Sequence, residues 1–244
     1  MQDSRVILVT AANGELGDAI ARTFLEKDSA AIVWLGIHRR RERADALVEA
    51  HAERCHVVEL DVTREETWKR VVEEIVGRHG RLDALVNNAG GHEDGLLAQM
   101  PRESWSRILA LNLDSAFLGC QAVLPTMISQ RSGRIVNIAS LSALLAPAGQ
   151  ANYAAAKAGL VGMTRSLAKE VARIGITVNA VCPGYIDTEA LNGMDNEARK
   201  AARARIPMRR FGRPDEVASL VEFLAGAEAG YITGAAIKID GGIY

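Results

Sequence analysis

A tyrosine and a lysine four residues apart, Tyr153 and Lys157, are the side chains of this chain best suited to acid–base chemistry. They lie in a stretch that predicts the start of a helix, where a spacing of four places both on one face. A phenol ionises near pKa ~10, so it exchanges protons at neutral pH only where its anion is stabilised. An ammonium group one turn away provides that stabilisation. The same spacing also occurs on solvated helix surfaces, so the rest of the chain must decide between the two interpretations.

Two further polar residues precede this pair and extend its chemistry. Ser140 stands thirteen residues before Tyr153, directly after a predicted strand, where its hydroxyl can hydrogen-bond a carbonyl oxygen. Ser142 is a rival two residues later, and the position at the strand end favours Ser140. Asn112 lies inside a long predicted helix, where its amide either holds a water molecule or satisfies a local distortion of the helix. These two roles for Asn112 can coexist.

Short runs rich in β-branched residues alternate with longer amphipathic runs through the whole chain. The expected strands cover residues 6–9, 31–35, 56–59, 84–86, 134–138, 177–181 and 236–239. The expected helices lie near residues 16–27, 40–52, 64–79, 102–130, 152–174 and 214–226. This alternation predicts an α/β fold in which helices cover both faces of a doubly wound parallel sheet. No linker, repeat or low-complexity tract interrupts it, so we expect a single domain over residues 1–244.

A doubly wound sheet binds its ligands beyond the carboxyl ends of its strands, and the polar candidates follow strands. Ser140 follows the fifth predicted strand, and Asn88 with Gly90 follows the fourth. One long connection, residues 187–207, breaks the rhythm after the sixth strand. A connection of that length is either a binding lid or a poorly ordered loop, and we favour a substrate lid.

The composition argues against several classes of protein. A formal net charge of −1 at pH 7 gives no sign of a nucleic-acid binder. Cys55, Cys120 and Cys182 lie far apart in apolar runs, and neither they nor the five histidines have metal-ligand spacing, so we expect buried free thiols and no metal. Only His92 is expected near a pocket, with a loop surface as its other interpretation. We find no cationic leader and no apolar stretch long enough to cross a bilayer, which favours a cytoplasmic protein without membrane contact.

A glycine-containing turn connects the first predicted strand to a helix, with the sequence TAANGELG over residues 10–17. Such a turn presents free backbone N–H groups and the positive end of the helix dipole to a pyrophosphate. Gly17 suits close packing of the helix on the strand, and Gly14 supplies a permissive backbone. Glu15 opposes this interpretation, because its carboxylate would repel the phosphate unless it turns outward.

The second predicted strand ends in GIHRRR over residues 36–41, with no acid before Glu42. Sites that prefer NAD carry an acid there to bind the ribose 2′-hydroxyl, whereas a basic residue accommodates the 2′-phosphate of NADP. We therefore favour NADP(H), with His38 and Arg39 beside the phosphate. The other interpretation is that these arginines form the solvated first turn of the next helix.

Together these residues resemble the short-chain dehydrogenase/reductase family, whose fold is a single-domain Rossmann-type sheet, and the resemblance covers essentially the whole chain. The residues that match its catalytic tetrad in order and approximate spacing are Asn112, Ser140, Tyr153 and Lys157. The resemblance also implies a nicotinamide cofactor and the residues that hold it. These are Thr10, Asn13, Gly14, Leu16, Gly17, His38, Arg39, Asp61, Val62, Asn88, Ala89, Gly90, Tyr153, Lys157, Pro183, Gly184, Ile186 and Thr188.

The chain departs from this family in the turn that carries its phosphate-binding glycines, Thr-Gly-x-x-x-Gly-x-Gly. Ala11 replaces the first glycine and Glu15 the second. Gly14 stands where the family's extended branch has a glycine, which can compensate. It also stands where many NADPH-dependent relatives have an arginine, which leaves the 2′-phosphate to the basic run from His38.

Within the family the chain is most similar to 3-oxoacyl-[acyl-carrier-protein] reductases, in stretches such as GQANYAAAKAGL over residues 149–160. The resemblance implies NADPH-dependent reduction of a 3-oxoacyl thioester and a homotetramer. It also implies an acidic carrier protein met by Arg131 beside the mouth of the active site. Another carbonyl or alcohol substrate is one alternative. A cofactor-poor subunit of a hetero-oligomer is another, which Glu15 motivates and the intact tetrad opposes.

Overall fold

Seven parallel strands form one sheet in the order β3-β2-β1-β4-β5-β6-β7. The computed structural model describes residues 4–244, so the first three residues of the expected domain lie outside the described chain. The strands are β1 (Val6–Thr10), β2 (Ile32–Ile37), β3 (Cys55–Glu59), β4 (Ala84–Asn87), β5 (Gly133–Ile138), β6 (Ile176–Pro183) and β7 (Ala236–Ile239). Because β1 pairs with both β2 and β4, the strand order reverses beside β1. That reversal creates the switch point at which doubly wound sheets bind ligands.

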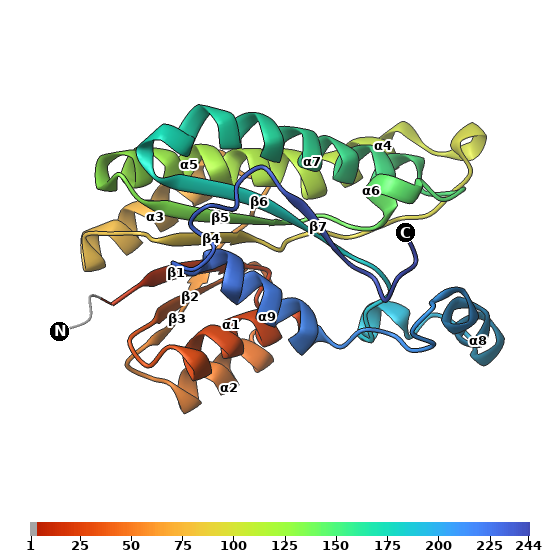
Figure 1. Ribbon diagram of the computed structural model, residues 1–244, viewed down its shortest axis with the longest axis horizontal. Helices are drawn as coiled ribbons and strands as arrows, with labels where there is room; N and C mark the ends of the chain where they lie inside the picture. Colours follow the sequence, from red (N-terminus) through yellow and green to blue (C-terminus); the bar gives the residue numbers. More distant parts are fainter. Residues whose placement is uncertain (1–3) are drawn as a thin grey trace.

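Helices cover both faces of the sheet, as the alternating pattern predicts (Figure 1). One face carries α1 (Glu15–Lys27), α2 (Glu42–Ala50) and α9 (Pro214–Ala225), which bury Phe24, Leu47 and Val221 against the strands. The other face carries α3 (Glu65–His79), α5 (Ser115–Gln130) and α7 (Ala151–Val171), which bury Trp68, Val123 and Val171. The predicted α/β doubly wound fold is therefore confirmed.

Shorter helical elements fill most of the connections at the carboxyl edge of the sheet, while η2 joins α4 to α5 and η3 ends α7 just before β6. They are η1 (Leu97–Gln99), α4 (Arg102–Leu109), the π-helical turn η2 (Ala110–Asp114), α6 (Ser142–Leu145), η3 (Ala172–Ile174), η4 (Glu189–Leu191) and α8 (Asn196–Arg205). Residues 187–207, expected as one long connection, thus contain η4 and α8. Asp195 caps α8 by accepting a hydrogen bond from the N–H of Ala198 at 2.8 Å. The segment therefore contains regular helical structure of its own rather than an irregular loop alone.

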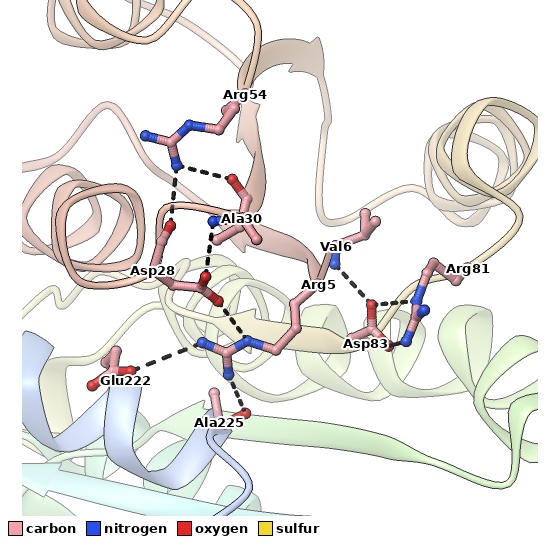
Figure 2. A network of polar contacts seen from close by, with 10 residues as sticks. Arg5, Val6, Asp28, Ala30, Arg54, Arg81, Asp83, Glu222 and Ala225 are labelled. Atoms are coloured by element: carbon pink, nitrogen blue, oxygen red, sulfur yellow. Dashed lines mark hydrogen bonds and ion pairs between the residues drawn. The ribbon is translucent and has the colours of Figure 1, made fainter. Parts of the chain in front are cut away.

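A polar network fastens the amino edge of the sheet, away from the switch point (Figure 2). Arg5, just before β1, pairs with Asp28 beyond α1 at 2.9 Å and donates to the carbonyl of Ala225 at the end of α9. Asp83, just before β4, accepts a hydrogen bond from the N–H of Val6 at 2.8 Å and pairs with Arg81. These contacts hold together the starts of β1 and β4, the two strands that flank the switch point.

The helical run Arg102–Gln130 corrects one expectation from the sequence. It is 29 residues long, and its most apolar window has a mean hydropathy of 1.4, so within residues 4–244 one helix meets the length and composition of a membrane span. A core helix of a soluble protein meets the same criterion. Here 39% of that window is buried, and the run packs on α3 and α7.

Candidate active site

Tyr153 and Lys157 lie on the first two turns of α7, as their spacing predicts. Lys157 is buried, and its Nζ donates to the carbonyl of Ile138 at the end of β5 at 2.8 Å. The ammonium lies 5.7 Å from the centroid of the Tyr153 ring. Burial lowers the pKa of Lys157 to about 8. The helix therefore presents a desolvated cation and a phenol to the same space beyond β5.

The ionisation of Tyr153 differs from the sequence-based expectation of a pKa lowered by Lys157. Burial raises the pKa of the phenol, a hydrogen bond with Ser140 lowers it, and the Asp94 carboxylate raises it, with a net upward shift. Desolvation is the largest cause because the phenol is partly buried, while the Lys157 ammonium is held by a backbone carbonyl. A raised pKa keeps the phenol protonated at neutral pH, which is the state that a proton donor requires.

The two serines after β5 have different partners. The Ser140 hydroxyl accepts a hydrogen bond from the N–H of Ser142 at 3.1 Å and contacts Tyr153. The Ser142 hydroxyl instead donates to the side chain of Gln150 at 2.8 Å. Ser140 is therefore the hydroxyl that lies with the phenol, as the strand-end position favours.

Asn112 is buried in the π-helical turn η2, and both hydrogens of its amide are in use. The Nδ2 atom donates to the carbonyls of Ile108 and Gly91, at 2.9 and 2.8 Å. The local role that the sequence suggested, the satisfaction of a helix distortion, is thus present. Only Oδ1, which also accepts a 3.3 Å hydrogen bond from the N–H of Gly91, is left to hold a water molecule.

Gly90 brings the loop after β4 against the tetrad. A Cβ atom on this residue would lie 2.7 Å from Oδ1 of Asn112 and 3.2 Å from Nζ of Lys157. Any side chain would collide with both groups, so only glycine lets this loop pack so closely against Asn112 and Lys157.

The loop that follows Gly90 forms a wall of the site that sequence reasoning largely missed. His92 lies edge-on to Tyr153, with 6.1 Å between ring centroids. Asp94 accepts hydrogen bonds from Gln150, and Asn152 donates to the carbonyl of Glu93 at 3.1 Å. The neighbouring glycines had placed His92 near a pocket, but no sequence signal pairs it with Tyr153, because the pairing depends on the fold of two loops.

Thr10 ties the turn after β1 to the loop after β4. Its buried hydroxyl accepts hydrogen bonds from the N–H groups of Asn88 and Ala89, both at 2.9 Å. The Asn88 side chain donates in return to the carbonyl of Thr10 at 3.0 Å and to that of Ala11. These three of the predicted cofactor residues thus fix the shape of the switch point, where β1 and β4 are neighbours.

The turn before α1 has the close approach that a pyrophosphate cradle requires. A Cβ atom on Gly17 would lie 2.4 Å from the carbonyl oxygen of Ala11, whereas Gly14, the N-cap of α1, is open. Ala11 adopts φ of 50°, the left-handed region that favours glycine. The chain therefore keeps the backbone path of a phosphate-binding turn at the helix N-terminus without its first glycine.

The carboxylate of Glu15 is engaged away from this turn. Its Oε2 accepts a hydrogen bond from the N–H of Glu189 in η4 at 2.6 Å, and its Oε1 lies 3.5 Å from Arg43 of α2. The Glu15 carboxylate therefore has partners of its own in η4 and α2, and with its charge engaged there the turn fits the pyrophosphate of a dinucleotide.

At the ends of β2 and β3 lie the residues predicted for the adenosine half. His38 Nδ1 is 3.7 Å from a carboxylate oxygen of Asp61. Asn13 donates to the backbone carbonyl of Arg39 at 2.9 Å. The Arg39 side chain is exposed and has no side-chain partner among residues 4–244. Val62 is buried and anchors Trp68 through its carbonyl.

The last group follows β6. The N–H of Gly184 donates to the carbonyl of Ile239 at 3.0 Å, and that of Leu141 to the carbonyl of Pro183 at 2.8 Å. Ile186 packs against the core on the α1 and α9 face of the sheet, and Leu16 packs there from α1. Thr188 is the N-cap of η4. All predicted site residues except Arg131 lie along the carboxyl edge of the sheet.

Arg131 lies at the opposite edge. It ends α5 just before β5 begins, with φ of 55°, while Ser140 follows the other end of β5. Six residues of strand separate the two positions by roughly 20 Å. The expectation that Arg131 stands beside the active-site mouth is therefore wrong within one chain.

A switch-point cradle beside a buried lysine, a phenol and a serine defines a nicotinamide-dependent oxidoreductase. Comparison with known proteins agrees, and the chain belongs to the short-chain dehydrogenase/reductase family. A family model described as enoyl-(acyl carrier protein) reductase matches residues 11–244.

Relatives align with nearly the whole chain. The 3-oxoacyl-[acyl-carrier-protein] reductase of Thermotoga maritima is 41% identical over 244 residues, 99% of this chain and 98% of the relative. That of Vibrio cholerae is 42% identical over 242 residues, with 99% and 98% covered. Nodulation protein G of Azospirillum brasilense is also 42% identical over 242 residues, with 98% of each chain covered.

Proposed function

We propose that the chain reduces the ketone of a 3-oxoacyl thioester to the 3-hydroxyacyl product with NADPH. The observation that supports this most is the cluster of a protonated phenol, a serine hydroxyl and a buried lysine. The serine follows the carboxyl end of β5, and the other two lie on the first turns of α7. When bound, the cofactor supplies a hydride from its nicotinamide. The relatives named as 3-oxoacyl-[acyl-carrier-protein] reductases support the substrate class.

In this mechanism Ser140 donates a hydrogen bond to the ketone oxygen and orients the carbonyl. Tyr153 would transfer its proton to that oxygen as the carbonyl carbon receives the hydride, so that the ketone becomes a secondary alcohol and the phenol a phenolate. Lys157 stabilises the phenolate and binds the ribose hydroxyls of the cofactor. A water molecule on Oδ1 of Asn112 returns a proton through Lys157.

The preference for NADPH over NADH rests on the basic run after β2. Arg39 and Arg40 are exposed and, within residues 4–244, have no side-chain partner that would withhold them from a 2′-phosphate. No acid stands there to bind a 2′-hydroxyl, because Asp61 is turned to His38 and Thr63. Arg39→Ala should weaken NADPH binding and leave NADH binding unchanged.

We also propose a homotetramer in the cytoplasm and a substrate carried on an acidic carrier protein. Three buried free thiols suit a reducing compartment. Since Arg131 and Ser140 lie at opposite edges of one chain, Arg131 can guide a carrier protein to the site only if a second copy brings it there.

The test is the oxidation of NADPH by the purified protein with three acceptors: a 3-oxoacyl thioester, a 2-enoyl thioester and a cyclic ketone. Turnover of the first alone supports the proposal. Turnover of the enoyl thioester would favour the reaction in the name of the family model, and preference for the cyclic ketone would favour another carbonyl substrate. Absence of NADPH and NADH binding would favour a structural subunit.

A further inference from the structure

Glu15, the residue that departs most from a phosphate-binding turn, belongs to a three-residue bridge. Glu15 is the first residue of α1, and its carboxylate accepts the N–H of Glu189 at 2.6 Å. Arg43 closes the triangle, with its Nη2 3.5 Å from Glu15 and 2.5 Å from the Glu189 carboxylate. One guanidinium thus lies between two carboxylates, and the backbone N–H of Glu189 gives Glu15 a second donor.

The bridge joins three elements that follow different strands. Glu15 comes after β1, Arg43 lies in α2 after β2, and Glu189 opens η4 after β6. Because β4 and β5 separate β1 from β6 in the sheet, the segment after β6 must cross the carboxyl edge to reach α1. This is the edge that carries the turn of residues 10–17 and Thr188.

The same segment is tied to the helix that follows it. Asp187 pairs with Arg199 of α8 at 2.7 Å, and Arg199 also donates to the carbonyl of Leu191. A movement of Glu189 away from α1 therefore carries η4 and α8 with it. The bridge holds one side of a unit that spans residues 187–205.

We propose that Glu15 is a positioning residue that fastens the segment after β6 across the bound dinucleotide, so that release of the dinucleotide requires the bridge of Glu15, Arg43 and Glu189 to open. The inference rests on the proposed cofactor site. Glu15 is tolerated at a glycine position because its carboxylate interacts with Arg43 and the N–H of Glu189 and so repels the pyrophosphate less. The three side chains are partly exposed, with 30% of Glu15, 38% of Arg43 and 60% of Glu189 accessible. Such ion pairs are of moderate strength, so the expected effect on rates is moderate too.

The decisive measurement is the dissociation rate of NADPH and of NADH from the full chain, by stopped-flow displacement. Glu15→Gln and Glu15→Gly should each release both dinucleotides about threefold to tenfold faster. The factor should be the same for NADPH and NADH, because the bridge spans the half that the two share. Arg43→Gln should accelerate NADH release as Glu15→Gln does, and the double variant should add little.

The matched control is Asp18→Asn. It removes one negative charge from the same first turn of α1, but Asp18 pairs with Arg22 of its own helix at 3.1 Å. Its release rates should equal those of the wild type. Tighter dinucleotide binding in Glu15→Gln and Glu15→Gly would mean that Glu15 merely repels the phosphate, and unchanged rates would mean that the bridge has no role; either result overturns the inference.

A second readout needs no cofactor. Without dinucleotide, trypsin should cut α8 at Arg199, Lys200 or Arg203 faster in Glu15→Gln than in the wild type or Asp18→Asn. Equal cleavage would count against the bridge. If the wild type binds neither dinucleotide, the proposed cofactor site fails together with this inference, whereas binding by the wild type with unchanged variants refutes the inference alone.

Discussion

The proposed catalytic half of the site matches the family's sequence pattern, whereas the proposed cofactor turn departs from it. Around Tyr153 every side chain of the tetrad is present, and each has a hydrogen-bond partner or a close neighbour that fixes it. In the turn after β1 two glycines are replaced, yet the backbone keeps its course, with Ala11 at φ of 50° and Glu15 bonded to the N–H of Glu189. Proton transfer uses side-chain atoms, which have no substitute. A pyrophosphate is held by backbone N–H groups, so residue types there can change while the path persists.

The largest expected effect lies in the catalytic half. Tyr153→Phe removes the proton donor and should lower kcat by about 10²–10⁴-fold, with NADPH affinity almost unchanged in a fluorescence titration. Tyr231→Phe is the matched control, because Tyr231 is fully exposed. Wild-type turnover by Tyr153→Phe would show that the side-chain half is as tolerant as the turn, which would break the comparison.

The two serines test the same half more finely. Ser140→Ala should lose about 10²-fold in kcat, the usual effect of removing a hydrogen-bond donor to the reacting oxygen. Ser142→Ala should lose far less, because its hydroxyl is committed to Gln150. Steady-state kinetics of the two variants give the ratio, and equal losses would refute the role of Ser140.

Burial of Lys157 should be visible in the pH dependence of stability. Burial lowers its folded-state pKa to about 8, from the 10.5 of an exposed lysine. Between these values the unfolded chain binds more protons than the folded chain, so the free energy of unfolding contributed by this group rises with pH. Relative to Lys157→Met, the wild type should gain about 3 kcal/mol from about pH 8 to about pH 10.5.

Urea unfolding across that range measures the gain. Lys169→Met is the control on the same helix, since Lys169 is exposed. A wild type whose stability runs parallel to that of Lys157→Met would show that Lys157 has an ordinary pKa in the folded chain.

The smallest effect belongs to the cofactor turn. Ala11→Gly relieves a left-handed alanine, which costs about 1–2 kcal/mol, but it also frees the unfolded chain, so a net gain of about 0.5–1 kcal/mol is expected. Ala12→Gly, at the buried neighbour, should destabilise instead. Thermal or urea unfolding compares them, and the same sign for both would show that the turn is unstrained.

The sequence predicts the sheet and most helices because their apolar periodicity is local. It also predicts that Ser140, Asn88 and Thr10 lie along one edge of the sheet, since the carboxyl ends of parallel strands share that edge. It misses α8, whose Ala- and Arg-rich composition buries only Ala202 and so has no apolar stripe.

Contacts between distant loops were beyond prediction from local pattern. The pairing of His92 with Tyr153 and the bridge from Glu15 to Glu189 each join segments that only the assembled fold brings together. Arg131 shows the converse error. The resemblance to the family places Arg131 beside the active site, but Arg131 precedes β5 and Ser140 follows it. The length of this strand therefore puts the two residues at opposite edges of the sheet.

The π-helical turn η2 has a consequence for how the chain tolerates changes in length. It holds one more residue than an α-helical turn does. Side chains donate hydrogen bonds to the backbone carbonyls there, from Asn112 to Ile108 and from Ser115 to Leu111. Deletion of one residue from η2 would restore a regular α-helix and leave α5 packed on the sheet. It would also rotate Asn112 by about 100° around the helix axis. Loss of one residue here is therefore expected to remove the proposed proton relay through Asn112 without unfolding the helix.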